Sequence, residues 1–429
     1  MTSYDVIVIG AGPAGSTVAT LVADAGRRVL VVERAKFPRF HIGESLMPDT
    51  YWPFKRLGLL DKLKEGRFVK KYSVQFVTPT GKESQPFFFD EMNPHESAQT
   101  WQVVRSEFDQ MMLDNARAHG AEVWEETGVT DVVLEPAGGG DTLPRATGVV
   151  VQRAGEAPRT LSAKVVVDAT GTNAMLSRKL GIRRGDPKLR KASYFAHYKG
   201  GRRDPGKSEG ATLVLSTAGQ DGWFWYIPLP DDVVSVGVVG DIDRLVTANK
   251  GKSPEQILEE EIKNCRGLDD RMTSAVRVSP VHVLSDFSYR ATRCAGEGWV
   301  LVGDAFGFLD PMYSSGVFLA LKSGEMAADA IVEALANDDV SGARLGRWGD
   351  ELAGGMQSIR KLVYAFYTKD FSFGKFIREN PDMKKNLVDL LVGNVFYDGV
   401  DEIFRTMAQT IPLPDAIPLE KPAQPPVIA

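Results

Sequence analysis

The stretch YDVIVIGAGPAGSTVATLVADAGRRVLVVER, residues 4–34, decides the fold of this chain. A short apolar strand leads into Gly10, Gly12 and Gly15, a helix follows, and a second apolar strand ends at Glu33. In such a unit the first glycine makes a tight turn, the second lets a pyrophosphate approach the backbone, and the third lets helix and strand pack closely. An acid at the end of the second strand can accept hydrogen bonds from a ribose diol. The stretch therefore predicts a dinucleotide-binding βαβ unit, with a glycine turn that serves packing alone as the alternative.

Length and composition predict a globular protein with more than one lobe. The chain has 429 residues, of which 43% are apolar and 25% charged, and its net charge is −5. That charge argues against nucleic acid as a partner. No apolar run reaches membrane-spanning length, and the N-terminus lacks the basic lead of a secretion signal. Cys265 and Cys294 fit a reducing compartment, and the five scattered histidines indicate no metal centre. We therefore expect a cytoplasmic protein without a membrane, nucleic-acid or metal partner.

The dinucleotide-binding domain is expected to be discontinuous. Two later apolar strands also end in a glycine and an acid: KVVVDATG at Asp168 and Gly171, and GWVLVGDAFG at Gly303 and Asp304. Each alone would be an ordinary strand-end turn. We expect an α/β fold with a Rossmann-like domain, an inserted strand-rich substrate lobe and a helical C-terminal lobe. The expected segments are 1–70, 101–190 and 276–345 for the first, 71–100 and 191–275 for the second, 346–410 for the third, and an extended or poorly ordered proline-rich tail over 411–429.

Two serine-containing segments predict helix starts. Ser253 precedes PEQILEEEIKN and is a possible cap for that helix. Ser314, Ser315 and Gly316 precede VFLALKSGEMAADAIVEAL, which has the spacing of a helix packed on a core. A serine can accept hydrogen bonds from the free amides of a first turn, but the same amides can also hold an anion. At the second segment the sequence leaves both interpretations open.

Three motifs connect these elements to a known family. The segment WFWYIP, residues 223–228, fits W-x-W-x-I-P. The segment FVKKYSVQF, residues 68–76, matches F-x-x-K-x-G-x-x-F except that Ser73 replaces the glycine. The segment FLDPMYSSG, residues 308–316, matches F-x-x-P-x-x-S-x-G. Together with the N-terminal unit, over roughly residues 1–345, they resemble the flavin-dependent halogenases, which belong to the FAD-dependent hydroxylase-like flavoproteins.

The resemblance implies an FAD site. FAD would lie over Gly10, Gly12 and Gly15 with a ribose at Glu33. Asp304 would contact the ribityl and phosphate region, and Arg105, in WQVVRSEFD, would close over the cofactor. The alternative for Arg105 is a surface salt bridge.

The resemblance also implies a reaction. Reduced FAD and oxygen would turn chloride or bromide, held by the amides of Ser315 and Gly316, into hypohalous acid. Trp223 and Trp225 would keep the organic substrate away from the flavin, although two tryptophans on one face of a strand are also typical of a core. The oxidant would pass through the interior to Lys71, which would hold it or become a haloamine and deliver halogen to an aromatic carbon. The adjacent Lys70 is expected to be a solvated charge.

One departure narrows the expected substrate. Tryptophan halogenases carry a glutamate where this chain has Tyr313, so the chain resembles the phenol and pyrrole halogenases, whose electron-rich substrates are free or tethered to a carrier protein. The single G-x-G-x-x-G fits a system in which a separate NAD(P)H-dependent flavin reductase supplies reduced FAD. The alternatives are a flavin monooxygenase or hydroxylase, a geranylgeranyl-reductase-like oxidoreductase, and a flavin-binding scaffold or sensor without turnover.

Overall fold

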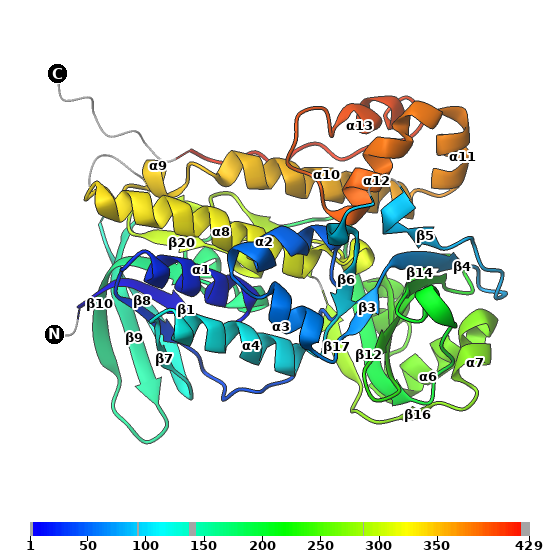
Figure 1. Ribbon diagram of the computed structural model, residues 1–429, viewed down its shortest axis with the longest axis horizontal. Coiled ribbons are helices and arrows are strands. Elements are labelled where there is room, and N and C mark those ends of the chain that lie inside the picture. The colour runs from blue at the N-terminus through cyan, green and yellow to red at the C-terminus, as the bar shows by residue number, and fades with distance from the viewer. Residues whose placement is uncertain (1–2, 92–93, 137–142, 286, 422–429) are drawn as a thin grey trace.

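The computed structural model describes residues 3–91, 94–136, 143–285 and 287–421. It contains the predicted βαβ unit as β1 (Ser3–Ile9), α1 (Pro13–Asp24) and β2 (Val29–Val32). The expected α/β fold class is confirmed: sheets and helices alternate along the chain and pack into the layers seen in Figure 1. The part of the predicted proline-rich tail over 422–429 lies outside the described residues.

The first sheet is built around the βαβ unit. Its strands follow the order β19-β20-β10-β1-β2-β7, and β9 pairs with β10 and with β8. The helix α1 contacts both α4 and α8, and the three lie together over this sheet in Figure 1. The further elements are α4 (Arg105–Ala118), β7 (Glu122–Trp124), β8 (Thr127–Glu135), β9 (Arg145–Arg153), β10 (Arg159–Asp168), β19 (Ala295–Gly296), β20 (Trp299–Leu301) and α8 (Ser315–Ala336).

The register of this sheet brings four predicted strand ends to one edge. In the parallel pairs, Ile9 lies opposite both Val32 and Asp168, and Asp168 lies opposite Leu301. The turns that follow β1, β2, β10 and β20 therefore meet at the carboxyl edge of the sheet. This edge is where open α/β sheets bind their ligands.

A second sheet forms the lobe at the lower right of Figure 1. Its strands follow the order β16-β12-β15-β14-β13-β4-β5, and β17 also pairs with β12. Two of these strands, β16 and β17, lie beyond residue 275, where the sequence-based boundary of the lobe was set. The elements are β4 (Ser73–Val77), β5 (Phe87–Phe88), β12 (Lys191–Lys199), β13 (Thr212–Ser216), β14 (Gly222–Leu229), β15 (Val233–Asp241), α6 (Pro254–Asn264), α7 (Arg266–Met272), β16 (Val276–Arg277) and β17 (His282–Ser285).

Short elements join the two sheets. A two-stranded sheet of β3 (Val69–Lys71) and β6 (Thr100–Gln102) lies between them, and β11 (Arg183–Gly185), β18 (Tyr289–Ala291) and β21 (Gly307–Phe308) form a three-stranded sheet. The remaining helices of the first two lobes are α2 (Tyr51–Arg56), α3 (Leu60–Glu65) and α5 (Met175–Lys179).

The C-terminal part is helical up to Met407. It consists of α9 (Gly342–Leu345), α10 (Gly349–Tyr367), α11 (Phe373–Glu379), α12 (Lys384–Val392) and α13 (Glu402–Met407), and α11 to α13 gather at the upper right in Figure 1. Residues 412–421 form neither helix nor strand, and α10 holds them because Gln357 and Arg360 donate to the carbonyls of Pro414 and Asp415. Among the helices of the described ranges, none has the length and apolar character needed to cross a bilayer.

Candidate active site

The three fingerprint glycines have different structural roles. Gly10 has φ +100°, and a Cβ there would lie 2.5 Å from the carbonyl oxygen of Ala169. A Cβ at Gly15 would lie 2.0 Å from the carbonyl oxygen of Gly10, so both positions exclude a side chain within the protein itself. At Gly12 the nearest atom to such a Cβ is 3.8 Å away, on the side chain of Arg39. Gly12 therefore leaves space open beside the first turn of α1, as a pyrophosphate requires.

The surroundings of this space suit an anionic dinucleotide. No side chain caps α1 at Gly12, and no acid lies in its first turn, so the helix N-terminus keeps its positive potential. Glu33 is buried, and its carboxylate accepts hydrogen bonds from the amides of Ala11 and Ala35, each at 2.9 Å. These bonds fix the carboxylate at the end of β2, beside the glycine turn.

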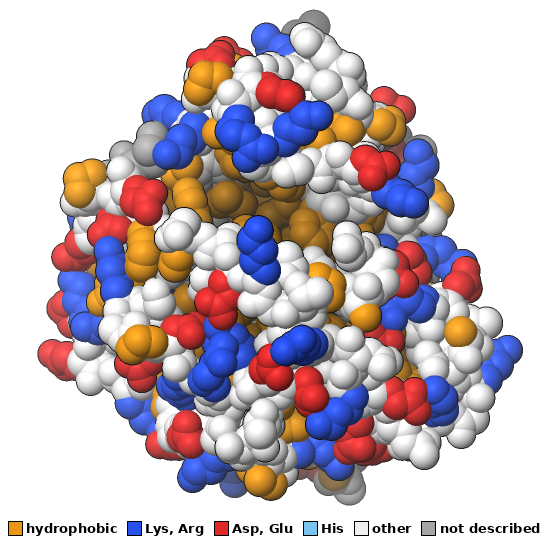
Figure 2. Space-filling model, turned by 90° about the vertical axis from the view of Figure 1, so that its right-hand side faces the viewer, with side chains coloured by type: hydrophobic (Ala, Val, Ile, Leu, Met, Phe, Trp, Pro, Cys, Tyr) orange, Lys and Arg blue, Asp and Glu red, His pale blue; other side chains and the backbone are white. Residues whose placement is uncertain are grey.

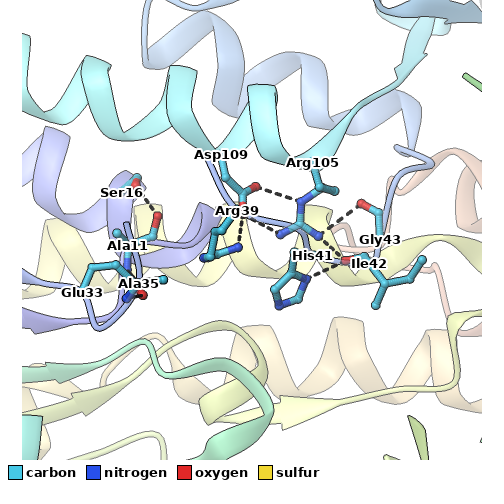
Figure 3. A network of polar contacts seen from close by, with 10 residues as sticks. All are labelled: Ala11, Ser16, Glu33, Ala35, Arg39, His41, Ile42, Gly43, Arg105 and Asp109. Carbon is cyan, nitrogen blue, oxygen red and sulfur yellow. Dashed lines mark hydrogen bonds and ion pairs between the residues drawn. The ribbon is translucent and has the colours of Figure 1, made fainter. Parts of the chain in front are cut away.

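Arg105 is buried rather than on the surface, so the surface salt bridge considered for it is wrong. Its Nε lies 2.8 Å from a carboxylate oxygen of Asp109, and Nη1 donates to the carbonyls of Ile42 and Gly43. Arg39 pairs with the same carboxylate at 3.0 Å. In Figure 3 the two guanidinium groups lie on either side of Asp109 and connect α4 to the segment around Ile42. Arg105 thus holds the segment around Ile42, which follows β2, against α4.

Asp304 and Asp168 follow neighbouring strands but differ in their partners. Asp168 accepts hydrogen bonds from the amides of Thr170 and Leu176, so it is used by its own turn. Among the described residues, no hydrogen-bond or ion-pair partner is found for the carboxylate of Asp304. Burial raises the pKa of Asp304 to about 7, while the positive charge of Arg105 opposes this shift. An unpaired acid at the carboxyl edge fits the ribityl hydroxyls of FAD, which can donate to it.

Lys71 is a buried amine with no acidic partner among the described residues. It ends β3 and is 2% exposed, whereas Lys70 is exposed. Its Nζ donates to Ser45 Oγ and to the Leu46 carbonyl, both at 2.9 Å. Burial lowers the pKa of Lys71 from 10.5 to about 7. Neutral and charged forms of the amine are therefore both populated near neutral pH.

A largely apolar cavity connects Lys71 to the motif over 308–316. It encloses about 450 Å³, including the part open to solvent, and no acidic side chain lines it. Figure 2 views the molecule from the side that carries β4, β5 and α11, where hydrophobic side chains line a hollow. The cavity residues are Lys71, Val74, Phe76, Phe87, Phe89, Thr212, Val214, Met312, Tyr313, Ser314 and Leu391.

The two tryptophans belong to a buried apolar cluster that includes residues of the cavity. Trp223 and Trp225 point to one face of β14, with ring centres 6.1 Å apart. They belong to a cluster that contains Ile42, which Arg105 holds near the cofactor cradle, and also Val74 and Val214 of the cavity. The pair therefore belongs to the buried packing next to the cavity.

A chain of hydrogen bonds that the sequence did not indicate connects Trp223 to the turn at Pro311–Tyr313, which precedes α8. Trp223 Nε1 donates to Tyr367 Oη at 2.9 Å, and Tyr367 donates to Asp310 at 2.9 Å. Asp310 also accepts from the amide of Met312 and so caps the turn that leads to α8. Asp310 stands at a free position of the motif and Tyr367 in the helical lobe, where the family resemblance is weaker. Only the spacing of Asp310 one residue before Pro311 could have suggested a cap.

The start of α8 is not capped by serine. Ser314 has φ +58° and its side chain accepts no amide of the first turn, so the simple capping interpretation is wrong. A Cβ at Gly316 would meet no atom within 4 Å, and no acid lies in the first turn. The first turn of this 22-residue helix thus has no side-chain cap and no acid, which leaves the positive potential of its N-terminus uncompensated. Such a helix start can hold an anion, and the preceding residue, Ser314, lines the cavity.

Comparisons with known proteins agree with this geometry. The model of the family described as tryptophan halogenase matches residues 5–96 and 88–410. A pyrrole-2-carbonyl-[peptidyl-carrier protein] brominase of Pseudoalteromonas luteoviolacea is 35% identical over 92% of this chain and 93% of the relative. The corresponding chlorinase of Pseudomonas fluorescens is 29% identical over 95% of this chain and 93% of the relative.

Solved structures give the same result. The flavin-dependent brominase Bmp2 superimposes with a TM-score of 0.83 at 33% identity, over 95% of this chain and 98% of that one. The myxobacterial chondrochloren halogenase CndH has a TM-score of 0.78 at 30% identity, over 98% of this chain and 100% of that one.

Fold and site together define an FAD-dependent oxidoreductase of the hydroxylase-like class. The chain belongs to the tryptophan halogenase family of flavin-dependent halogenases. It is therefore a halogenating enzyme that uses FAD and chloride or bromide. The family name does not define its substrate, because the relatives reported above act on a pyrrole.

Proposed function

We propose that this halogenase acts on an electron-rich aromatic acyl group, such as pyrrole-2-carbonyl, that is tethered to a carrier protein. The proposal is supported by two relatives that span 92% and 95% of the chain and carry this activity in their names. It is also supported by the cavity, whose lining has Tyr313 and no carboxylate. An electron-rich ring needs no carboxylate to stabilise the cation formed when halogen adds.

The observation that carries the proposal is the buried amine of Lys71 at the wall of this cavity. When bound, reduced FAD supplies, with dioxygen and halide, the two-electron oxidation that converts halide to hypohalous acid. Two of the positions around Lys71 Nζ are occupied by its bonds to Ser45 and Leu46. The remaining position carries a proton in the charged amine and a lone pair in the neutral one. The charged form can donate to the oxidant's oxygen, and the neutral form can attack its halogen and release hydroxide.

Halogen transfer to the substrate is an electrophilic aromatic substitution, in which the halogen replaces a ring hydrogen. The ring carbon takes the electrophilic halogen from Lys71 or from the hypohalous acid that it holds, and the ring proton leaves. Trp223 and Trp225 exclude the ring from the cofactor side, which favours transfer through Lys71 over direct oxygenation of the ring. The amides of Ser315 and Gly316 hold the halide, since the α8 N-terminus is uncapped and free of acids.

We also propose that a separate NAD(P)H-dependent reductase supplies reduced FAD and that the enzyme works in the cytoplasm. The second point is supported by Cys265 and Cys294, which are both buried and free. The cavity beside Lys71 is partly open to solvent, which supports access for a tethered substrate.

The decisive experiment combines the protein, a flavin reductase, NADH, FAD, bromide and pyrrole-2-carbonyl carrier protein, with brominated product followed by mass spectrometry. We expect Lys71→Ala to retain FAD binding and oxygen consumption but to lose at least 100-fold in product, as expected when the group that directs the reaction is removed. Lys70→Ala is the matched control and should keep wild-type turnover, because Lys70 is exposed. Undiminished bromination by Lys71→Ala would contradict the assignment.

A further inference from the structure

A chain of polar side chains lies behind Lys71. Ser45 Oγ, which accepts from Lys71, lies 2.9 Å from Thr212 Oγ1. Gln102 Nε2 donates to Thr212 Oγ1 at 2.8 Å and to the Gly210 carbonyl at 2.9 Å. Ser45, Thr212 and Gln102 are all buried. The direction of each bond in this chain can be assigned from the partners present.

The Gly210 carbonyl fixes the direction at one end. A carbonyl oxygen only accepts, so the atom of Gln102 that faces it must be the amide nitrogen. The same nitrogen lies against Thr212, and Thr212 Oγ1 is therefore an acceptor from Gln102. The amide oxygen of Gln102 has no partner in the structure, which agrees with this orientation.

The bond between Ser45 and Thr212 is then decided by their protons. If Thr212 donated to Ser45, both side chains that contact Ser45 Oγ, those of Lys71 and Thr212, would be donors to it. The buried Ser45 proton would then have no acceptor. A buried donor without a partner costs about 1–3 kcal/mol. If Ser45 donates to Thr212, the unpaired proton is that of Thr212 instead, and Thr212, unlike Ser45, lines the cavity, where water or a substrate oxygen can accept it. The favoured arrangement therefore leaves one free O–H, on Thr212.

This free O–H belongs to a residue that lines the cavity. Thr212 and Val214 alternate along β13 with Leu213 and Leu215, which lie in the core of the second lobe. The neighbouring strand places Val74 opposite Thr212. Thr212 thus faces the cavity beside Lys71. The hydroxyl of Tyr313, which also lines the cavity, instead donates to the Leu362 carbonyl.

We propose that Thr212 is a specificity-determining residue whose hydroxyl donates to a carbonyl oxygen attached to the aromatic ring of the substrate. The inference rests on the function proposed above and goes beyond it, because it names the substrate group that is recognised. A carbonyl held by Thr212 would orient the adjoining ring toward Lys71. An aromatic compound without such an oxygen could not accept this hydrogen bond.

The test compares two probes in wild type and in Thr212→Val, which keeps the side-chain shape and removes the hydroxyl. The probes are pyrrole-2-carbonyl pantetheine thioester and unsubstituted pyrrole. We expect the variant to bind and brominate the thioester about 10- to 100-fold less well, the range for a lost donor to a buried acceptor. The effect on pyrrole should stay within about threefold, and Thr212→Ser should restore use of the thioester.

Two controls separate this role from a structural one. Ser45→Ala keeps the Thr212 hydroxyl and removes a partner of Lys71, so it should reduce turnover of both probes alike. An equal loss on both probes in Thr212→Val would overturn the inference and assign Thr212 to the support of Lys71, and no loss on either would overturn it as well. The dissociation constant of the thioester is measured directly, so the inference is decided even if the wild type brominates neither probe and the proposed function fails.

Discussion

Replacing Lys71 with methionine should remove a pH-dependent penalty on folding. The amine is 2% exposed and burial lowers its pKa from 10.5 to about 7. Between these two values the unfolded chain binds more protons than the folded one, so the Lys71 contribution makes the protein more stable as pH rises. The Lys71→Met variant has no such group and should lack this part of the pH dependence.

The size of the effect follows from the shift. A fall in the pKa of Lys71 from 10.5 to about 7 corresponds to about 5 kcal/mol at ~1.4 kcal/mol per pH unit. At pH 9 about 2 kcal/mol of this penalty remains, so wild type should gain about 2–3 kcal/mol between pH 7 and pH 9. Methionine leaves Ser45 Oγ and the Leu46 carbonyl without their donor, which costs about 1–2 kcal/mol. At pH 7 the variant should still be more stable than wild type.

The assay is urea denaturation of the FAD-free protein at pH 7, 8 and 9, followed by tryptophan fluorescence. The difference between wild type and Lys71→Met cancels the titration of all other groups. Lys70→Met is the matched control, because it makes the same change at an exposed neighbour and should follow the wild-type pH dependence. Equal pH dependence in wild type and Lys71→Met would refute the reasoning and imply that the buried amine has an ordinary pKa.

The other predictions concern Gly12, the amides of Ser315 and Gly316, and Tyr367. Gly12→Val should abolish FAD binding with little loss of stability, because the space at Gly12 is open in the protein; absorbance of bound flavin and thermal melting measure the two effects, and normal FAD occupancy would contradict the cradle. A crystal soaked in bromide should show anomalous density at the amides of Ser315 and Gly316, and density only at the surface or only near the lysine would refute that site. Tyr367→Phe removes the acceptor of Trp223 Nε1 and one of the two donors to Asp310, so it should destabilise the protein by about 1–3 kcal/mol in denaturation experiments. Because that hydroxyl also supports the turn before α8, the KM for bromide should rise more than kcat falls. An unchanged KM would show that the hydrogen bonds from Trp223 through Tyr367 to Asp310 do not contribute to halide binding.

Much of the fold could be predicted from local sequence. The strand, glycine turn and helix over 4–34 follow from local spacing, and Gly10 allows the φ of +100° that the turn adopts. Ser253 was predicted as a helix cap, and it forms a capping box with Gln256. These features depend on residues that are close in the chain, so the sequence is sufficient to determine them. The motif around Lys71 also indicated the family that the comparisons confirm.

The tertiary structure alone decided how the candidate site works. Ser314 has a capping residue type but a left-handed backbone, and its side chain caps nothing. Trp223 and Tyr367 meet although 144 positions separate them in the chain, and Ser45 and Thr212 meet across 167. Hydrogen-bond direction and desolvation depend on every neighbour in space, and the spacing of residues along one segment does not contain that information. For this reason the sequence could name Lys71, whereas only the packed interior determined its pKa and the free hydroxyl of Thr212 beside it.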